Sequence, residues 1–113
     1  MSDCLFCSII NGDIDASIVY EDEQVIAFRD INPQAPVHCL VIPRRHIETV
    51  SDLTDSEEEL TGHLVNVARQ IAEKEGLKAG YRLVFNCGDQ AGQEVMHIHL
   101  HLLGGRKLNW PPG

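Results

Sequence analysis

Three histidines alternate with apolar residues near the C-terminal end of the chain. The segment 97–103 reads His97-Ile98-His99-Leu100-His101-Leu102-Leu103. Side chains alternate between the two faces of a strand, so this pattern predicts one face of imidazoles and one apolar face. Imidazole serves as a nucleophile near neutral pH and as a metal ligand. We therefore expect the imidazole face to line a site for covalent catalysis or for a metal ion, and a merely polar sheet face is the remaining alternative.

A glycine-rich loop directly precedes the histidines. It reads Asn86-Cys87-Gly88-Asp89-Gln90-Ala91-Gly92-Gln93. Glycine allows backbone N–H groups to approach a phosphate closely. A phosphate cradle beside imidazoles suits phosphoryl or nucleotidyl transfer, although a plain hairpin loop has the same composition.

A second group of chemistry-bearing residues lies at the N-terminus, where Cys4 and Cys7 form a CxxC pair. In a cytosolic chain this spacing indicates a metal site or a redox motif. A redox CxxC usually lies between a strand and a helix of a βαβ unit, and no such unit is evident in this sequence.

The elements that must position these groups are short strands and two helices. We expect a short helix over residues 4–10, strands over 19–20, 24–29, 37–42, 82–86 and 96–103, and one long helix. The long helix begins at Thr54, whose spacing to Glu57 matches a capping box, and ends at Gly76. The sequence thus predicts one α+β domain over residues 1–113, an antiparallel five-stranded meander sheet with the long helix on one face.

The composition excludes some classes of function. The chain has 113 residues and a formal net charge of -8, whereas nucleic-acid-binding proteins present a basic face. No apolar run is long enough to span a bilayer, and residues 1–15 lack the basic start of a signal peptide. We expect a cytoplasmic protein that binds neither nucleic acid nor a membrane, with its cysteines present as thiols or metal ligands.

The motifs together resemble the histidine triad (HIT) family, whose signature is His-φ-His-φ-His-φ-φ with φ apolar. Residues 97–103 match every position of it. Segments 27–36 and 37–43 and the pair Gly92-Gln93 are also similar to the family, and segment 104–113 is similar to its Hint branch in particular. The resemblance implies a HIT-like fold, a homodimer and a purine nucleotide as substrate.

The resemblance also implies catalytic roles. His99 matches the nucleophile that attacks the α-phosphorus and forms a nucleotidyl-histidine intermediate. His101 matches a phosphate contact, and His38 matches the histidine that orients the other ring nitrogen of the nucleophile. Asp30 matches the carboxylate that accepts the ribose hydroxyls, with Ile31 beside it in the same nucleotide-binding segment.

Further nucleotide contacts follow from the same resemblance. Phosphate contacts are expected from Asn86, Gly92 and Gln93, and an apolar slot for the base from Leu5, Phe6, Ile9, Phe28 and Leu40. Ordinary core packing is an equal alternative for Ile9 and Leu40. Glu94 stands where close Hint relatives usually have serine, and we expect its carboxylate to face away from the phosphate or to contact the leaving group.

Some HIT proteins hold structural zinc with a CxxC pair and two histidines, which correspond here to Cys4, Cys7, His46 and His97. A Cys2His2 set gives closed tetrahedral coordination, so this zinc is structural and catalysis does not require it. The alternative is unmetallated thiols with His46 on the surface.

The reaction implied is hydrolysis of purine nucleoside 5′-phosphoramidates, such as a conjugate of AMP with an amine. Residues 110–113 would reach towards a partner subunit's site. A dinucleoside polyphosphate hydrolase of the Fhit type is the enzymatic alternative. A non-catalytic nucleotide- or zinc-binding interaction protein is the alternative from another class.

Overall fold

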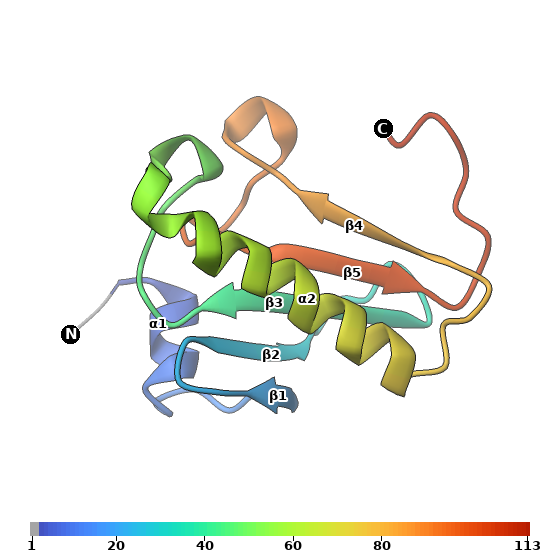
Figure 1. The fold of residues 1–113 in the computed structure, drawn as a ribbon, viewed down its shortest axis with the longest axis horizontal. Coiled ribbons are helices and arrows are strands. Elements are labelled where there is room, and N and C mark those ends of the chain that lie inside the picture. Colours follow the sequence, from blue (N-terminus) through green and yellow to red (C-terminus); the bar gives the residue numbers. More distant parts are fainter. Residues whose placement is uncertain (1–2) are drawn as a thin grey trace.

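The computed structural model describes residues 3–113 and contains a five-stranded antiparallel sheet crossed by one long helix (Figure 1). The strands are β1 (Ile18–Glu21), β2 (Val25–Arg29), β3 (Val37–Pro43), β4 (Tyr81–Phe85) and β5 (Leu100–Gly104); the helices are α1 (Leu5–Ile10) and α2 (Glu58–Lys74), with 3-10 turns η1 (Val50–Asp52), η2 (Asp55–Glu57) and η3 (Asp89–Ala91). The expected α+β class, the five antiparallel strands and both helices are confirmed. Among the described residues, no helix has the length and apolar character needed to cross a membrane.

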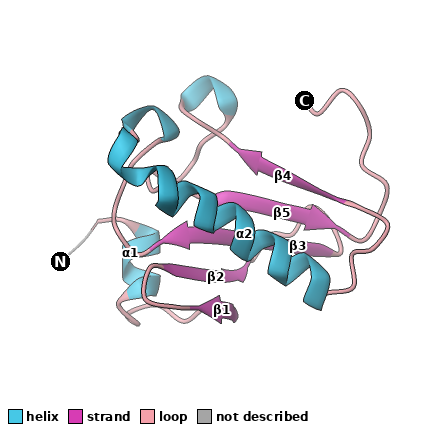
Figure 2. Cartoon of the chain, in the orientation of Figure 1, coloured by secondary structure: helices cyan, strands magenta, loops and turns pink. Residues whose placement is uncertain are grey.

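The strand order is β1-β2-β3-β5-β4, so the sheet is a meander only as far as β3. The connection from β3 to β4 contains α2 and crosses the sheet, which leaves room for β5 between them (Figure 2). The buried Leu100 and Leu102 of β5 occupy this central place, and the half-exposed β4 forms the edge. His101 therefore lies between Leu40 of β3 and Val84 of β4.

The fifth strand is shorter than expected, because it begins at Leu100 and not at residue 96. Val41 of β3 pairs with Leu100, and β3 ends two residues later at Pro43, which has no N–H to donate to a longer ladder. The backbone before β5 is held differently, by a hydrogen bond of 2.7 Å from the N–H of Ile98 to the carbonyl of Ile47. His97 and His99 thus precede the strand, and only His101 belongs to it.

Side-chain alternation gives the sheet two different faces. One face packs on α2, with a buried core formed by Val25, Ala27, Cys39, Val41, Leu64, Val67, Ala68, Ile71, Ala72, Leu100 and Leu102. The opposite face packs on α1, where Phe6 meets Ile26, Phe28, Leu40 and Ile42. His38 and His101 alternate with residues of the α2 face, so both lie on the α1 face.

The start of the long helix is capped as the sequence predicts, although through a 3-10 turn. The carboxylate of Glu57 accepts hydrogen bonds from the Thr54 N–H (2.7 Å) and the Thr54 hydroxyl (3.0 Å). It also pairs with Arg45 at 3.1 Å. Glu57 is buried although it is charged, because these partners replace its water.

The contact between α2 and the sheet is testable with one pair of variants. Leu64→Ala removes a fully buried side chain from that core, and we expect it to lower the free energy of unfolding by about 2–5 kcal/mol. Val65→Ala changes the exposed neighbour on the same helix and should cost about 0.5 kcal/mol or less. Chemical denaturation measures both, and equal losses would contradict the packing described here.

Candidate functional site

Three of the predicted site histidines gather on the α1 face of the sheet. The ring centroids of His99 and His101 are 5.0 Å apart, and Nε2 of His38 lies 2.9 Å from Nδ1 of His101. His38 comes from β3 and His101 from β5, which are neighbouring strands. The structure therefore brings the three predicted catalytic residues into one group, in which His38 and His99 are buried and His101 is partly buried.

Hydrogen-bond directions assign the protons of His38 and His101. The backbone N–H of Gln34 donates to Nδ1 of His38 at 3.0 Å, so the neutral His38 ring carries its proton on Nε2. That proton is donated to Nδ1 of His101, which leaves an N–H on Nε2 of His101. His101 thus presents a hydrogen-bond donor without carrying a positive charge.

Burial keeps both rings neutral. It lowers the pKa of His38, against the opposing effect of the Asp30 carboxylate. Burial, together with the neighbouring His99 and His38, lowers the pKa of His101 to about 4. At pH 7 both rings are neutral, as the assigned hydrogen bonds require.

His99 is oriented by the backbone of its own segment. Its Nδ1 lies 2.7 Å from the carbonyl oxygen of His97, and a carbonyl can only accept. The proton of the neutral ring is therefore on Nδ1, and Nε2 keeps its lone pair. This corrects the expected role of His38, which contacts His101 and not His99, because His99 precedes β5 and turns its ring to its own backbone.

Phe6 of α1 contacts the same group from the side. Its ring meets His99 edge to face with centroids 5.1 Å apart, and it also contacts His97 (5.9 Å) and Phe28 (5.4 Å). Such aromatic contacts favour one ring orientation over others. Phe6 thus restricts how the ring of His99 can turn.

Asp30 follows β2 and reaches the histidines. Its backbone N–H donates to the carbonyl of His38 at 2.9 Å, and its Oδ2 lies 3.5 Å from Nε2 of His38. Its other carboxylate oxygen accepts from the N–H of Asn32. Ile31 lies beside it with its side chain almost fully exposed, so the structure places Asp30, but not the Ile31 side chain, against the histidines.

Four of the five residues expected to line a base slot lie together. Phe6, Phe28 and Leu40 are buried in the cluster on the α1 face, and Ile9 packs against it. Phe28 pairs with Leu40 across β2 and β3, and Leu40 pairs with His101. Leu5 is half-exposed and lies outside this cluster.

The glycine-rich loop differs from the expected phosphate cradle at Gln93. Its side-chain amide donates to the carbonyls of Glu48 (2.7 Å) and Val95 (3.0 Å), and its Oε1 accepts from the N–H of Gly88 (2.9 Å). The N–H of Gly92 is also used, by the carbonyl of Asp89. Gln93 therefore braces the loop and has no N–H left for a phosphate.

Two other loop residues remain open to a ligand or to solvent. Within residues 3–113, the side-chain amide of Asn86 makes no hydrogen bond, so it is available as the expected phosphate contact. Glu94 is exposed and lines a surface groove with Asp3, Leu5, Glu48 and Met96.

Cys4, Cys7, His46 and His97 form a second cluster, whose ligand atoms all lie within 4.8 Å of one another. The Nδ1 atoms of the two histidines are 3.2 Å apart, and three of the four sulfur–nitrogen pairs are 3.3, 3.4 and 3.6 Å apart. A tetrahedral zinc site with Zn–N of about 2.0 Å and Zn–S of about 2.3 Å has edges of about 3.3 and 3.5 Å. The donor set therefore fits zinc in both chemistry and size.

His97 is prepared to act as a ligand through Nδ1. Its Nε2–H donates to the carbonyl of Pro43 at 2.8 Å, which leaves the lone pair of Nδ1 directed into the cluster. Burial lowers the pKa of His97, which keeps the ring neutral. The four predicted metal ligands are thus brought together. Cys4 and Cys7 come from the start of α1, His46 from the loop after β3, and His97 from the segment before β5.

Sequence reasoning missed three backbone groups of the site. These are the carbonyls of His97 and Pro43 and the N–H of Gln34, which together set the tautomers of four imidazoles. No sequence signal could have identified them, because nearly every residue carries the same groups.

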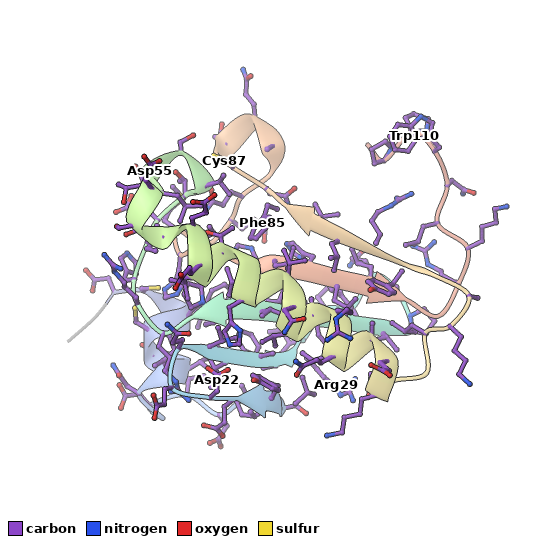
Figure 3. All side chains as sticks on the ribbon, in the orientation of Figure 1. Asp22, Arg29, Asp55, Phe85, Cys87 and Trp110 are labelled. Atoms are coloured by element: carbon purple, nitrogen blue, oxygen red, sulfur yellow. The ribbon has the colours of Figure 1, made fainter. Side chains whose placement is uncertain are left out.

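Trp110, near the C-terminus, lies apart from both clusters. It is strongly exposed on the tail that follows β5 (Figure 3). The tail segment 110–113 is exposed along its whole length.

Comparisons with known proteins agree with this geometry. The sequence model of the HIT domain matches residues 11–108. An uncharacterized HIT-like protein of Synechococcus elongatus is 52% identical over 98% of this chain and 97% of its own, and a 14 kDa zinc-binding protein of Zea mays is 51% identical over 99% and 89%.

Solved structures show the same fold. The crystal structure of a HIT family hydrolase from Legionella pneumophila superposes with a TM-score of 0.97 at 54% identity, covering 98% of this chain and 100% of that one. A histidine triad protein from Clostridium difficile gives 0.93 at 44% identity, with 96% of each chain covered. The histidine pattern, the fold and these relatives agree, and the chain belongs to the HIT family.

Proposed function

We propose that this protein hydrolyses purine nucleoside 5′-phosphoramidates at the α-phosphate, through a nucleotidyl intermediate on His99. The observation that carries the proposal is the 2.7 Å hydrogen bond from Nδ1 of His99 to the carbonyl of His97, which leaves Nε2 as a nucleophile. The similar Legionella protein is described as a hydrolase, which supports the reaction class.

The first step forms a bond between Nε2 of His99 and the α-phosphorus and breaks the P–N bond to the amine. The amine leaves with the electron pair of that bond and takes up a proton from solvent water. The His99 ring becomes cationic when Nε2 is phosphorylated, and its Nδ1–H bond to the His97 carbonyl then becomes charge-assisted and stronger. This hydrogen bond favours the intermediate over the free enzyme.

His101 supports the same step as a neutral donor. Its Nε2–H is directed by the chain of hydrogen bonds from Gln34 through His38, and it can bind a phosphate oxygen as negative charge develops there. In the second step, water attacks the phosphorus, the P–N bond to His99 breaks, and the nucleoside monophosphate leaves.

We also propose that Cys4, Cys7, His46 and His97 hold one structural zinc ion. The donor set and its distances support this, and the similar protein from Zea mays is described as zinc-binding. Four protein ligands close the coordination sphere, so the ion contributes stability and takes no substrate.

Removal of the nucleophile tests the reaction. With an adenosine 5′-phosphoramidate carrying a fluorescent amine, His99→Ala should lower kcat by several orders of magnitude, because no other group can form the intermediate. AMP binding by the same variant, measured by calorimetry, serves as the control for an intact site. Wild-type protein that binds AMP without turnover indicates a binding protein, and turnover of dinucleoside polyphosphates alone indicates the Fhit-type reaction.

The neutral state of His101 makes stability depend on pH. Its pKa of about 4 in the folded chain lies below the unfolded value of about 6.5, so the unfolded chain binds more protons between these values. The free energy of unfolding should therefore fall as pH decreases from about 6.5 towards about 4. His101→Gln should reduce this slope in denaturant titrations, and an unchanged slope would contradict the depressed pKa.

Metal content tests the zinc proposal. Purified protein should contain about one zinc per chain, and Cys4→Ser should lose most of it and unfold at a lower temperature. Serine retains an acceptor for the N–H of Cys7, the hydrogen bond that caps α1, so the loss reports on the metal. Cys87→Ser is the matched control, because that thiol lies outside the cluster and contacts Ser51.

A further inference from the structure

The segment that carries His99 is not held by the sheet. The β5 ladder begins at Leu100, and the residues before it are tied to the rest of the backbone by one hydrogen bond from Ile98 to Ile47. The carbonyl of His97 accepts the hydrogen bond from the His99 ring. Its position therefore depends mainly on the contacts of the His97 side chain.

His97 is held through both nitrogens of its ring. Its Nε2 donates to the carbonyl of Pro43, and its Nδ1 lies 3.4 Å from Sγ of Cys4 and 3.2 Å from Nδ1 of His46. The ring is fully buried. The cluster thus supplies the contacts on one side of the His97 ring, and the Pro43 carbonyl supplies the contact on the other side.

Helix α1 forms a second link between the Cys2His2 cluster and His99. Phe6 lies between the two cysteines in sequence, and its ring packs against both His99 and His97. The helix has six residues, too few to be stable alone, so its position depends on its packing and on Cys4 and Cys7. Two of the groups that contact the His99 ring, Phe6 and the His97 carbonyl, are thus attached to the Cys2His2 cluster, and His101 on β5 contacts the ring as well.

We propose that the cluster is a positioning device for the nucleophile: metal binding at Cys4, Cys7, His46 and His97 fixes Phe6 and the His97 carbonyl, and these hold the His99 ring in the tautomer with a free Nε2. Phe6 and His97 are positioning residues, since they act through His99. The part of this inference that concerns catalysis rests on the proposed function; the part that concerns the ring does not.

The test uses His46→Asn, because His46 is exposed and contacts the cluster without touching His99. Long-range ¹H–¹⁵N correlation spectra report the tautomer of each imidazole. Zinc-loaded wild-type protein should show one set of His99 signals, with Nδ1 protonated and Nε2 unprotonated. His46→Asn, and wild type stripped by a chelator, should show His99 in mixed tautomers and kcat lowered about tenfold or more.

His63→Asn is the matched control. It removes an imidazole from α2, on the opposite face of the sheet, where it contacts Asp22. This variant should keep its zinc, its His99 signals and its kcat. A purely structural zinc site would lower the unfolding temperature of His46→Asn without changing the His99 tautomer, and that result overturns the proposal.

Phe6→Leu keeps all four ligands. It therefore tests whether α1 positions the His99 ring even if the zinc-free proteins do not fold. We expect it to retain zinc and to shift or broaden the His99 signals, and unchanged signals overturn the aromatic connection. Zinc-dependent His99 signals in a wild-type protein that hydrolyses no phosphoramidate would refute the proposed function and leave the positioning inference standing.

Discussion

The hydrogen bond between Nδ1 of His99 and the carbonyl of His97 is the interaction on which the rest of the site depends. It decides which nitrogen of the neutral His99 ring keeps its lone pair, and it needs a chain segment that is free of the sheet ladder. A carbonyl within the ladder would already be accepting a strand hydrogen bond. The early end of the pairing between β3 and β5 at Pro43 therefore makes this hydrogen bond possible.

The strand order determines the remaining geometry. Because β5 lies between β3 and β4, His101 has a strand on each side and is held against His38 of β3. A simple meander would place β5 at the sheet edge, away from β3. The pKa of His101 would then lie closer to its ordinary value, because an edge position is better solvated. The central place of β5 is thus what keeps a histidine neutral as a donor.

The sequence was sufficient to predict the helices and strands and most residues of both histidine clusters. Alternation, capping and CxxC spacing are local patterns, so they can be recognised without tertiary contacts. It could not predict where β5 begins, because that depends on Pro43 of a strand distant in sequence. It also misassigned Gln93, whose amide suits a phosphate in composition but is used by the carbonyls of Glu48 and Val95. The role of His38 was wrong for a similar reason, since its partner depends on tertiary contacts.

The two histidine clusters differ in what completes them. In one, His46 and His97 face two thiols, and soft sulfur with imidazole nitrogen favours zinc. In the other, His38 and His101 face Asp30, but the N–H of Gln34 occupies Nδ1 of His38 and so leaves a proton on Nε2. A metal ion there would have to displace that proton and disrupt the hydrogen-bond chain. The backbone N–H of Gln34 thus makes the difference between the two clusters. Both contain histidines, but the cluster with His38 is suited to hydrogen-bond donation and the cluster with His97 is suited to metal binding.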